Sequence, residues 1–195
     1  MLLHPSVPAK TVPEFIAYAK ANPNKISCAS GGVGSILQMA GEMFKTMTDT
    51  SMTHVPYRGI APALVDLLGG QVSVGFGGIP PTIDHIRNGR LRALAVTTTT
   101  RFELLPDIPP MADFVPGYEA SNWFAASLRK TTPVEIIDKL NKEINASIAE
   151  PEMKARIEKL GATPMPGSPA DFDKFITDET EKWGKVIREA GIKTE

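Results

Sequence analysis

The sequence predicts an α/β protein, because short apolar strands alternate with amphipathic helices along most of its length. Strand-like runs such as KISCAS (25–30) and QVSVGFG (71–77) are each followed by a glycine-containing turn and then by a helix-like segment. The pattern changes near residue 120, after which the spacing predicts three helices and almost no strand. We therefore expect strand–turn–helix units up to that point and a helical region after it.

Length and composition are those of an ordinary globular protein. The chain has 195 residues, 42% of them hydrophobic, and its 21 basic and 22 acidic residues give a formal net charge of -1. No basic stripe is present, so no nucleic-acid partner is expected. No apolar run approaches the roughly 20 residues that cross a membrane. The single cysteine, Cys28, excludes an internal disulfide and is expected in the core as a small hydrophobic residue.

The first elements have clear start signals. A helix is expected over VPEFIAYAKANP (12–23), with Thr11 as its N-cap and Pro13 in its first turn. The strand KISCAS (25–30) follows. After a glycine-rich turn, apolar residues at helical spacing predict a helix over 35–47.

The middle of the chain repeats this alternation. Pro56 is expected to end the pairing of the second strand, and Pro62 lies in the first turn of the next helix. The expected elements are the strand SMTHVPY (51–57), the helix APALVDLLGG (61–70), the strand QVSVGFG (71–77), the short helix PTIDHIRNGR (81–90), the strand LRALAVT (91–97), an irregular proline-rich segment (105–117) and an extended crossing segment, EASNWFAASL (119–128).

Three helices are expected in the last part of the chain. The first, 133–149, has Thr132 as its expected cap and Glu135 at its third position, as in a capping box. The others are 151–160, which ends at Gly161, and 169–190, which opens with Ser168 and Pro169 and ends at Gly191. Two of these helices carry apolar stripes that should be buried against something: Ile136, Ile137, Leu140, Ile144 and Ile148, and Phe172, Phe175, Ile176, Trp183 and Ile187.

Glycine-containing turns between strands and helices are the strongest functional signal. They are CASGGVGS (28–35), YRGIA (57–61) and GGIP (77–80). A helix start leaves free N–H groups and a partial positive charge, and in an open sheet several starts converge beyond the carboxyl ends of the strands. Glycines allow a ligand to approach this backbone closely. The sequence therefore predicts an amide-lined pocket that holds an anion as a ligand and not as a reactant.

Other readings of these turns remain open. A glycine-rich turn is often only a turn. No lysine follows Gly34, as a Walker loop would require, and the third glycine of a dinucleotide fingerprint would fall at Leu37. Because the second strand ends near Arg58 and not in an acidic residue, an NADP-type oxidoreductase stays an alternative.

Catalytic machinery is not evident in the sequence. His4, His54 and His85 lie on different expected elements without metal-ligand spacing. His54 is expected to be a hydrogen-bonded packing residue and not a base. No nucleophile elbow or paired catalytic carboxylates stand out, so we expect no enzyme, no metal site and no cofactor.

Several blocks together resemble one family over essentially the whole chain. In order, they are HPSVPAKTVPEFIAYAKANPNKISCASGGVGS, AGEMF, HVPYRGIAPALVDLLGGQV, LRALAVT, LPDIPPMADF, PGYEASNWF and EKWGKVIREAGIK. They resemble the Bug (TctC-like) family, the solute-binding receptors of tripartite tricarboxylate transporters. The resemblance implies a periplasmic-binding-protein type II-like fold, whose two lobes close on a small carboxylate or related amide. It also implies membrane transporter subunits as partners.

The resemblance also indicates which residues bind ligand. Ser30 and Ser35 would add hydroxyl donors, and Arg58 would add charge. Gly77-Gly78 stands where the family often has Asp-Asn, and Ile36, Leu37 and Gln38 replace small hydroxyl residues and a histidine, which hints at a less polar ligand. The candidate ligand-binding residues are Ser30, Gly31, Gly32, Gly34, Ser35, Tyr57, Arg58, Gly59, Ala61 and Gly78.

Family members begin with a signal peptide and a leading segment to which nothing in this chain corresponds. We therefore expect one complete α/β ligand-binding lobe over 1–120, and over 121–195 only the crossing strand and helices of a second, incomplete lobe. That explains apolar stripes without a sheet to cover, and it predicts a homo-oligomer formed through the C-terminal helices.

Two further expectations concern location and function. The resemblance implies a periplasmic protein, but MLLHPSVPAK is not a signal peptide, so the protein would be cytoplasmic if this is the native start. Besides the NADP-type oxidoreductase, two alternatives to a receptor remain. One is a ligand-sensing effector domain, and the other is a truncated remnant that no longer binds ligand.

Overall fold

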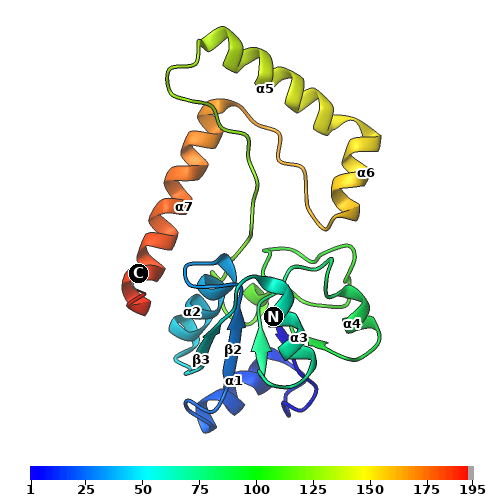
Figure 1. The fold of residues 1–195 in the computed structure, drawn as a ribbon, viewed down its shortest axis with the longest axis vertical. Helices are drawn as coiled ribbons and strands as arrows, with labels where there is room; N and C mark the ends of the chain where they lie inside the picture. The colour runs from blue at the N-terminus through cyan, green and yellow to red at the C-terminus, as the bar shows by residue number, and fades with distance from the viewer. Residues whose placement is uncertain (193–195) are drawn as a thin grey trace. The chain divides into compact units, whose positions relative to one another are not determined.

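The computed structural model describes residues 1–192 and divides them into two compact units (Figure 1). The first, here called the sheet unit, comprises Met1–Asn122 together with the described residues from Gly184 onward. The second, the helical unit, is Trp123–Trp183. Within 1–192, no helix combines the length and the apolar character needed to span a membrane.

The sheet unit is built on a mixed five-stranded sheet of order β3-β2-β4-β1-β5. β2 runs parallel to both β3 and β4, whereas β1 is antiparallel to β4 and β5. The predicted α/β class is therefore confirmed. The strands are β1 (Leu2–Leu3), β2 (Ser27–Ser30), β3 (Thr53–Pro56), β4 (Val74–Gly75) and β5 (Arg92–Ala93).

Helices of the sheet unit follow the predicted order. Thr11 caps the first of them by accepting from the Glu14 amide at 3.3 Å, as expected from the sequence. The elements are α1 (Val12–Ala21), α2 (Ile36–Thr48), α3 (Ile60–Leu68), α4 (Ile83–Arg87) and a 3-10 turn, η1 (Met111–Asp113).

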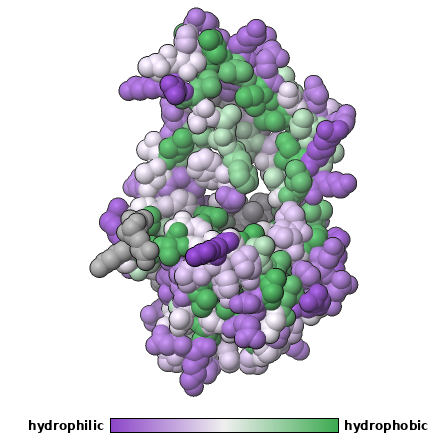
Figure 2. All heavy atoms as spheres, viewed as in Figure 1, coloured by the Kyte–Doolittle hydropathy of each residue, from purple (hydrophilic) through white to green (hydrophobic). Residues whose placement is uncertain are grey.

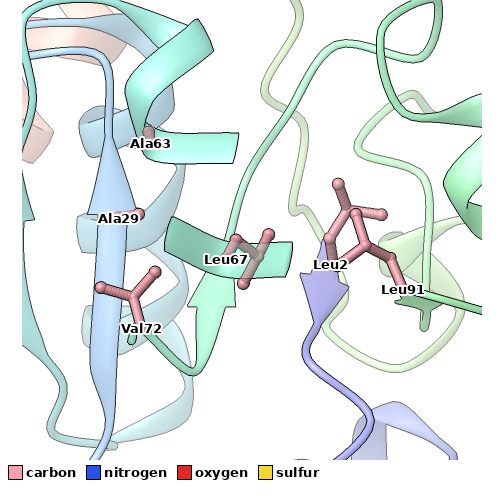
Figure 3. Close-up of a cluster of buried hydrophobic side chains, with 6 residues drawn as sticks. All are labelled: Leu2, Ala29, Ala63, Leu67, Val72 and Leu91. Carbon is pink, nitrogen blue, oxygen red and sulfur yellow. The ribbon is translucent and has the colours of Figure 1, made fainter. Parts of the chain in front are cut away.

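Successive residues of β2 face different helices, because side chains alternate between the two faces of a strand. Cys28 faces α2: its sulfur lies 3.3 Å from where a Cβ on Gly41 would be. The thiol is buried, as predicted, and burial raises its pKa to about 12. Ala29 instead belongs to a buried cluster with Ala63 and Leu67 of α3 (Figure 3). Helices thus cover both faces of the sheet at β2.

A second part of the core is aromatic and lies around α2. Phe44 is fully buried, and its ring centroid lies 5.9 Å from Phe15, 6.3 Å from Phe76 and 6.5 Å from Tyr118. The Tyr118 hydroxyl donates to the Ala40 carbonyl at 2.9 Å. This cluster ties α1, α2, the end of β4 and the segment before residue 120 into one body.

The helical unit contains α5 (Val134–Ala149), α6 (Pro151–Lys159) and the part of α7 (Pro169–Ala190) that ends at Trp183. Trp123 packs edge-to-face on Phe175, with ring centroids 5.3 Å apart, and on Phe172 at 6.1 Å. The indole N–H groups of Trp123 and Trp183 both donate to Glu179. These contacts fix α7 to the segment that enters the unit.

Of the two helix caps predicted in this part of the chain, the structure confirms one and contradicts the other. Ser168 caps α7 as predicted: its hydroxyl accepts from the Asp171 amide at 3.1 Å and donates to the Asp171 carboxylate at 2.7 Å. The prediction that Thr132 caps α5 is wrong. Pro133 has extended backbone angles (φ -56°, ψ 140°) and is itself the N-cap, with no side-chain capping bond.

The β4 and β5 strands are shorter than the runs QVSVGFG and LRALAVT predict, because each pairs with the two-residue β1. The expectation that the C-terminal stripes are buried is wrong for α5 within this chain, whereas Phe172 and Phe175 of the α7 stripe are half-buried against Trp123. No residue of α5 or α6 is buried, and Ile136, Leu140 and Ile144 are exposed. Figure 2 shows hydrophobic residues among the exposed side chains of this unit.

Candidate functional site

Two of the predicted turns lie side by side, because β2 and β3 are paired in parallel up to their carboxyl ends. Beyond that pairing, the Tyr57 amide donates to the Ser30 carbonyl at 3.0 Å and the Gly59 amide donates to the Gly31 carbonyl at 3.0 Å. A Cβ on Gly32, whose φ is +134°, would lie 3.3 Å from the Tyr57 carbonyl oxygen. The β2–α2 turn and the β3–α3 turn therefore form one continuous backbone surface.

Ser35 organises the start of α2, of which it is the N-cap. Its hydroxyl donates to the Gly32 carbonyl at 2.7 Å and accepts from the Gln38 amide at 3.4 Å. Gln38 completes the arrangement, because its side-chain oxygen accepts from the Gly34 amide at 2.7 Å. This role of Gln38 was not predicted, although the Ser-x-x-Gln spacing of a capping box could have indicated it.

Free donors remain at both helix starts. The amides of Ile36 and Leu37 belong to the first turn of α2, where helix geometry provides no acceptor. The same holds for Ile60 and Ala61 at the start of α3, whose N-cap Gly59 has φ +105° and makes no side-chain capping bond. In the described part of the chain, no other group accepts from these four amides. The Gly34 amide, in contrast, is already occupied by Gln38.

Ser30 lies beneath the turn and not on its surface. It is 1% exposed, and its Oγ is 2.6 Å from His54 Nε2. The same hydroxyl donates to the Gly32 carbonyl at 3.1 Å and accepts from the Gly32 amide at 3.2 Å. A serine bonded to a histidine has the atoms of a nucleophile and its base. Burial leaves this Oγ no access to a substrate, so the pair is a support for the turn.

His54 is thus hydrogen-bonded, as the sequence analysis expected. The pKa of His54 is lowered from its ordinary value of 6.5, mainly because burial penalises the imidazolium, an effect that Glu42 opposes and Lys45 reinforces. Since the folded protein binds this proton less readily than the unfolded chain, neutral His54 stabilises the fold above pH 6.5. That contribution is lost as the pH falls from 6.5 through the folded pKa.

A pH series with and without this histidine measures the contribution. Between about pH 7.5 and about pH 5.5, the free energy of unfolding is expected to fall more in the wild-type protein than in His54→Gln, because glutamine does not titrate. Urea unfolding at each pH gives the two differences. Equal differences in the two proteins would contradict the expected linkage.

Tyr57 and Arg58 differ in how far they are committed to other contacts. The Tyr57 hydroxyl donates to Asp66 at 2.7 Å, and this hydrogen bond is the main reason why the pKa of Tyr57 rises to about 12. Arg58 is exposed and makes no ion pair with any residue that the structure describes. Arg58 is therefore a free cation beside the start of α3.

The third predicted turn, Gly77-Gly78, adjoins the others through a small apolar cavity of about 20 Å³. Ile60, at the start of α3, and Gly77 line it together with Thr82. The Thr82 hydroxyl is bonded to the carbonyls of Gly78 (2.8 Å) and Ile79 (3.1 Å), which fixes the turn. All three turns thus lie at the carboxyl ends of β2, β3 and β4, as the sequence analysis predicted for an open sheet.

This arrangement offers backbone donors and one cation to an anion. Among residues 1–192, no three histidine, cysteine or acidic side chains are grouped as a metal site would require. Of the predicted site residues, the structure brings together Gly31, Gly32, Ser35, Gly59 and Ala61 around the helix starts. Their contact with a ligand stays a prediction.

Comparison with known proteins shows which family this chain resembles. A family model described as the tripartite tricarboxylate transporter family receptor, TctC, matches residues 1–192. Protein BugT of Bordetella pertussis is 35% identical over 194 residues, which are 99% of this chain and 60% of that protein. The chain thus spans about three fifths of the length of this relative.

Solved structures of related proteins are also similar to this chain. The R. palustris protein Rpa4515 with adipate is 35% identical with a TM-score of 0.87, over 98% of this chain and 65% of that one. The periplasmic binding protein BugD is 30% identical with a TM-score of 0.83, over 100% and 66%. MatC from Rhodopseudomonas palustris with bound malate is 26% identical with a TM-score of 0.78, over 95% and 65%.

These matches confirm the predicted periplasmic-binding-protein type of fold and the predicted resemblance. The family model covers nearly the whole chain, including both the turns of the sheet unit and the helical unit. The chain belongs to the tripartite tricarboxylate transporter receptor (TctC) family.

Proposed function

We propose that this chain forms part of a solute-binding receptor that captures a small carboxylate without catalysis. The observation that carries the proposal is the pair of adjoining helix starts, whose amides at Ile36, Leu37, Ile60 and Ala61 are free, with Arg58 beside them. Amides at a helix N-terminus and a nearby cation bind carboxylate oxygens well. Ser30 contributes from beneath, by shaping the turn, and Tyr57 contributes through its backbone.

The ligands of related proteins agree with a carboxylate. One relative was solved with adipate and another with malate, and both are small dicarboxylates. The NADP-type oxidoreductase and the sensing domain lack any comparable support. Ser30 is the serine at the site that is hydrogen-bonded to a histidine ring nitrogen, and its hydroxyl is buried. This burial favours a binding function over catalysis.

We further propose the wider setting that the family suggests. Residues 1–120 form one ligand-binding lobe and 121–195 contribute to the other. The receptor works in the periplasm and delivers its ligand to membrane subunits of a tripartite transporter. Exposed apolar residues of the helical unit, among them Leu140 and Ile144, support self-association of this chain.

Binding tests of two variants locate the site. Gly34→Asp and Arg58→Glu are each expected to weaken adipate or malate binding about 2- to 5-fold, because each brings negative charge to a helix start, an effect of roughly 0.3–1 kcal/mol. Titration calorimetry measures the affinities. NADPH, titrated in parallel, is expected not to bind.

Matched controls lie elsewhere in the sheet unit. Gly89, like Gly34, has a positive φ (+69° against +76°) and open space within 4 Å of where a Cβ would be, so Gly89→Asp carries the same strain and charge away from the site. Arg90→Glu reverses an exposed charge in the same loop as Gly89. If the site variants fold and titrate like these controls, the pocket lies elsewhere. If the protein binds NADPH and no carboxylate, the NADP-type oxidoreductase becomes the better-supported function.

A further inference from the structure

The Ser30 hydroxyl is the most densely bonded side-chain group under the candidate site. It lies 2.6 Å from His54 Nε2, 3.1 Å from the Gly32 carbonyl oxygen and 3.2 Å from the Gly32 amide nitrogen. Ser30 is almost completely buried, so water does not readily replace a lost partner. Removing a partner of a buried polar group costs the full desolvation of that group.

The hydrogen atoms can be followed through this contact. A serine hydroxyl has one proton and two lone pairs. The Gly32 amide takes one lone pair. When His54 Nε2 carries the ring hydrogen, it donates to the other lone pair and the serine proton goes to the Gly32 carbonyl; when Nε2 carries none, it accepts the serine proton in competition with that carbonyl. His54 therefore completes the hydrogen bonding of Ser30.

Gly32 transmits this contact to the binding surface. Its amide is held by Ser30, and its carbonyl accepts from the hydroxyl of Ser35 at 2.7 Å and from the Ser35 amide at 3.2 Å. Ser35 is the N-cap of α2, and the free amides of Ile36 and Leu37 follow it directly. A continuous chain of hydrogen bonds thus runs from His54 on β3 to the start of α2.

We propose that His54 is a positioning residue for ligand binding, which holds the β2–α2 turn through Ser30 and Gly32 so that the α2 amides face the ligand. This inference rests on the proposed function, because it assigns a role within that site. In this role His54 does not itself contact the ligand. It lies on the edge strand β3, which precedes Tyr57 and Gly59, and the amides of these two residues donate to the backbone of the same turn.

The surroundings favour the neutral ring that this role uses. Glu42 and Lys45 of α2 act on His54 in opposite directions and are paired with each other at 2.7 Å. Cys28, the register partner of His54 on β2, is a buried neutral thiol. Neutral His54 then makes a hydrogen bond that glutamine can imitate without titrating.

The test is a double-mutant cycle with a rescue variant, read by adipate and malate titration. His54→Leu and Ser30→Ala are each expected to lower affinity about 10-fold. The first removes a hydrogen-bond partner of Ser30, and the second removes a partner of both His54 and Gly32. The double variant is expected to lose no more than the worse single variant, since both remove one contact. His54→Gln is expected to recover most of the affinity. His85 lies on α4, and His85→Leu serves as the control whose affinity is expected to be unchanged.

Amide hydrogen exchange of Gly32 gives a readout that needs no ligand. Exchange is expected to be faster in His54→Leu and restored in His54→Gln. If His54→Leu does not fold, His54→Asn, which is polar but too short to reach Ser30, replaces it in both measurements.

The outcomes separate this inference from the proposed function. Three outcomes would each overturn the positioning role. The affinity losses of the two single variants could multiply in the double variant, His54→Gln could bind as weakly as His54→Leu, or His54→Leu could bind as tightly as the wild-type protein. If the wild-type protein binds neither dicarboxylate, the proposed function fails. The role of His54 in holding the turn is then decided by Gly32 exchange: unchanged exchange in His54→Leu overturns it, and faster exchange with rescue by glutamine supports it.

Discussion

Phe44→Ala is expected to lower the free energy of unfolding of the sheet unit by about 3–5 kcal/mol. Phe44 is 0% exposed and contacts the rings of Phe15, Phe76 and Tyr118. Truncation removes the transfer free energy of the ring and leaves a cavity between three side chains from different elements, which cannot all collapse into it. Proteins of this kind are typically stable by only about 5–15 kcal/mol, so the loss is a large share of the total.

Urea unfolding followed by far-ultraviolet circular dichroism measures this loss. Phe114→Ala is the matched control in the same unit, because Phe114 is 37% exposed and leaves a smaller void. Its cost is expected to be clearly below that of Phe44→Ala. Similar costs for the two variants would mean that the aromatic cluster around α2 is not the centre of the core.

Local signals made much of this fold predictable. The predicted caps Thr11 and Ser168 each bond to an amide three residues ahead, so a short window of sequence contains all the information. Buried Cys28 follows from its place in an apolar strand. The position of Pro133 relative to α5 is harder to predict, because its fixed φ suits either the cap or the first helical turn, and only its ψ of 140° decides between them.

Long-range pairing explains what the sequence could not indicate. The lengths of β4 and β5 depend on Leu2–Leu3, which lies more than 70 residues away along the chain. At the site, the glycine turns were found from their neighbours in sequence. The Ser30–His54 bond joins residues 24 apart on different strands, and that distance depends on the register of β2 and β3.

Self-association of this chain in solution is the other large effect that we expect. The helical unit exposes a run of apolar residues along one side of α5, at a spacing of four residues: Ile136, Leu140 and Ile144. Fully burying each such side chain stabilises by about 1.5–3 kcal/mol. Contiguous apolar surface of this kind rarely stays uncovered on soluble monomers. A second copy of the chain offers the same surface across a two-fold axis, so a dimer is expected.

Light scattering at micromolar concentration tests this expectation with a pair of charge substitutions. Leu140→Glu with Ile144→Glu is expected to shift the protein toward the monomer, because four-residue spacing places both carboxylates on the apolar side of α5. Ala146→Glu with Ala149→Glu adds the same charge to exposed positions on the opposite side of α5, and is expected to leave the mass unchanged. A wild-type chain that is monomeric, or a dimer that both double variants dissociate equally, would show that the exposed apolar side of α5 does not drive association.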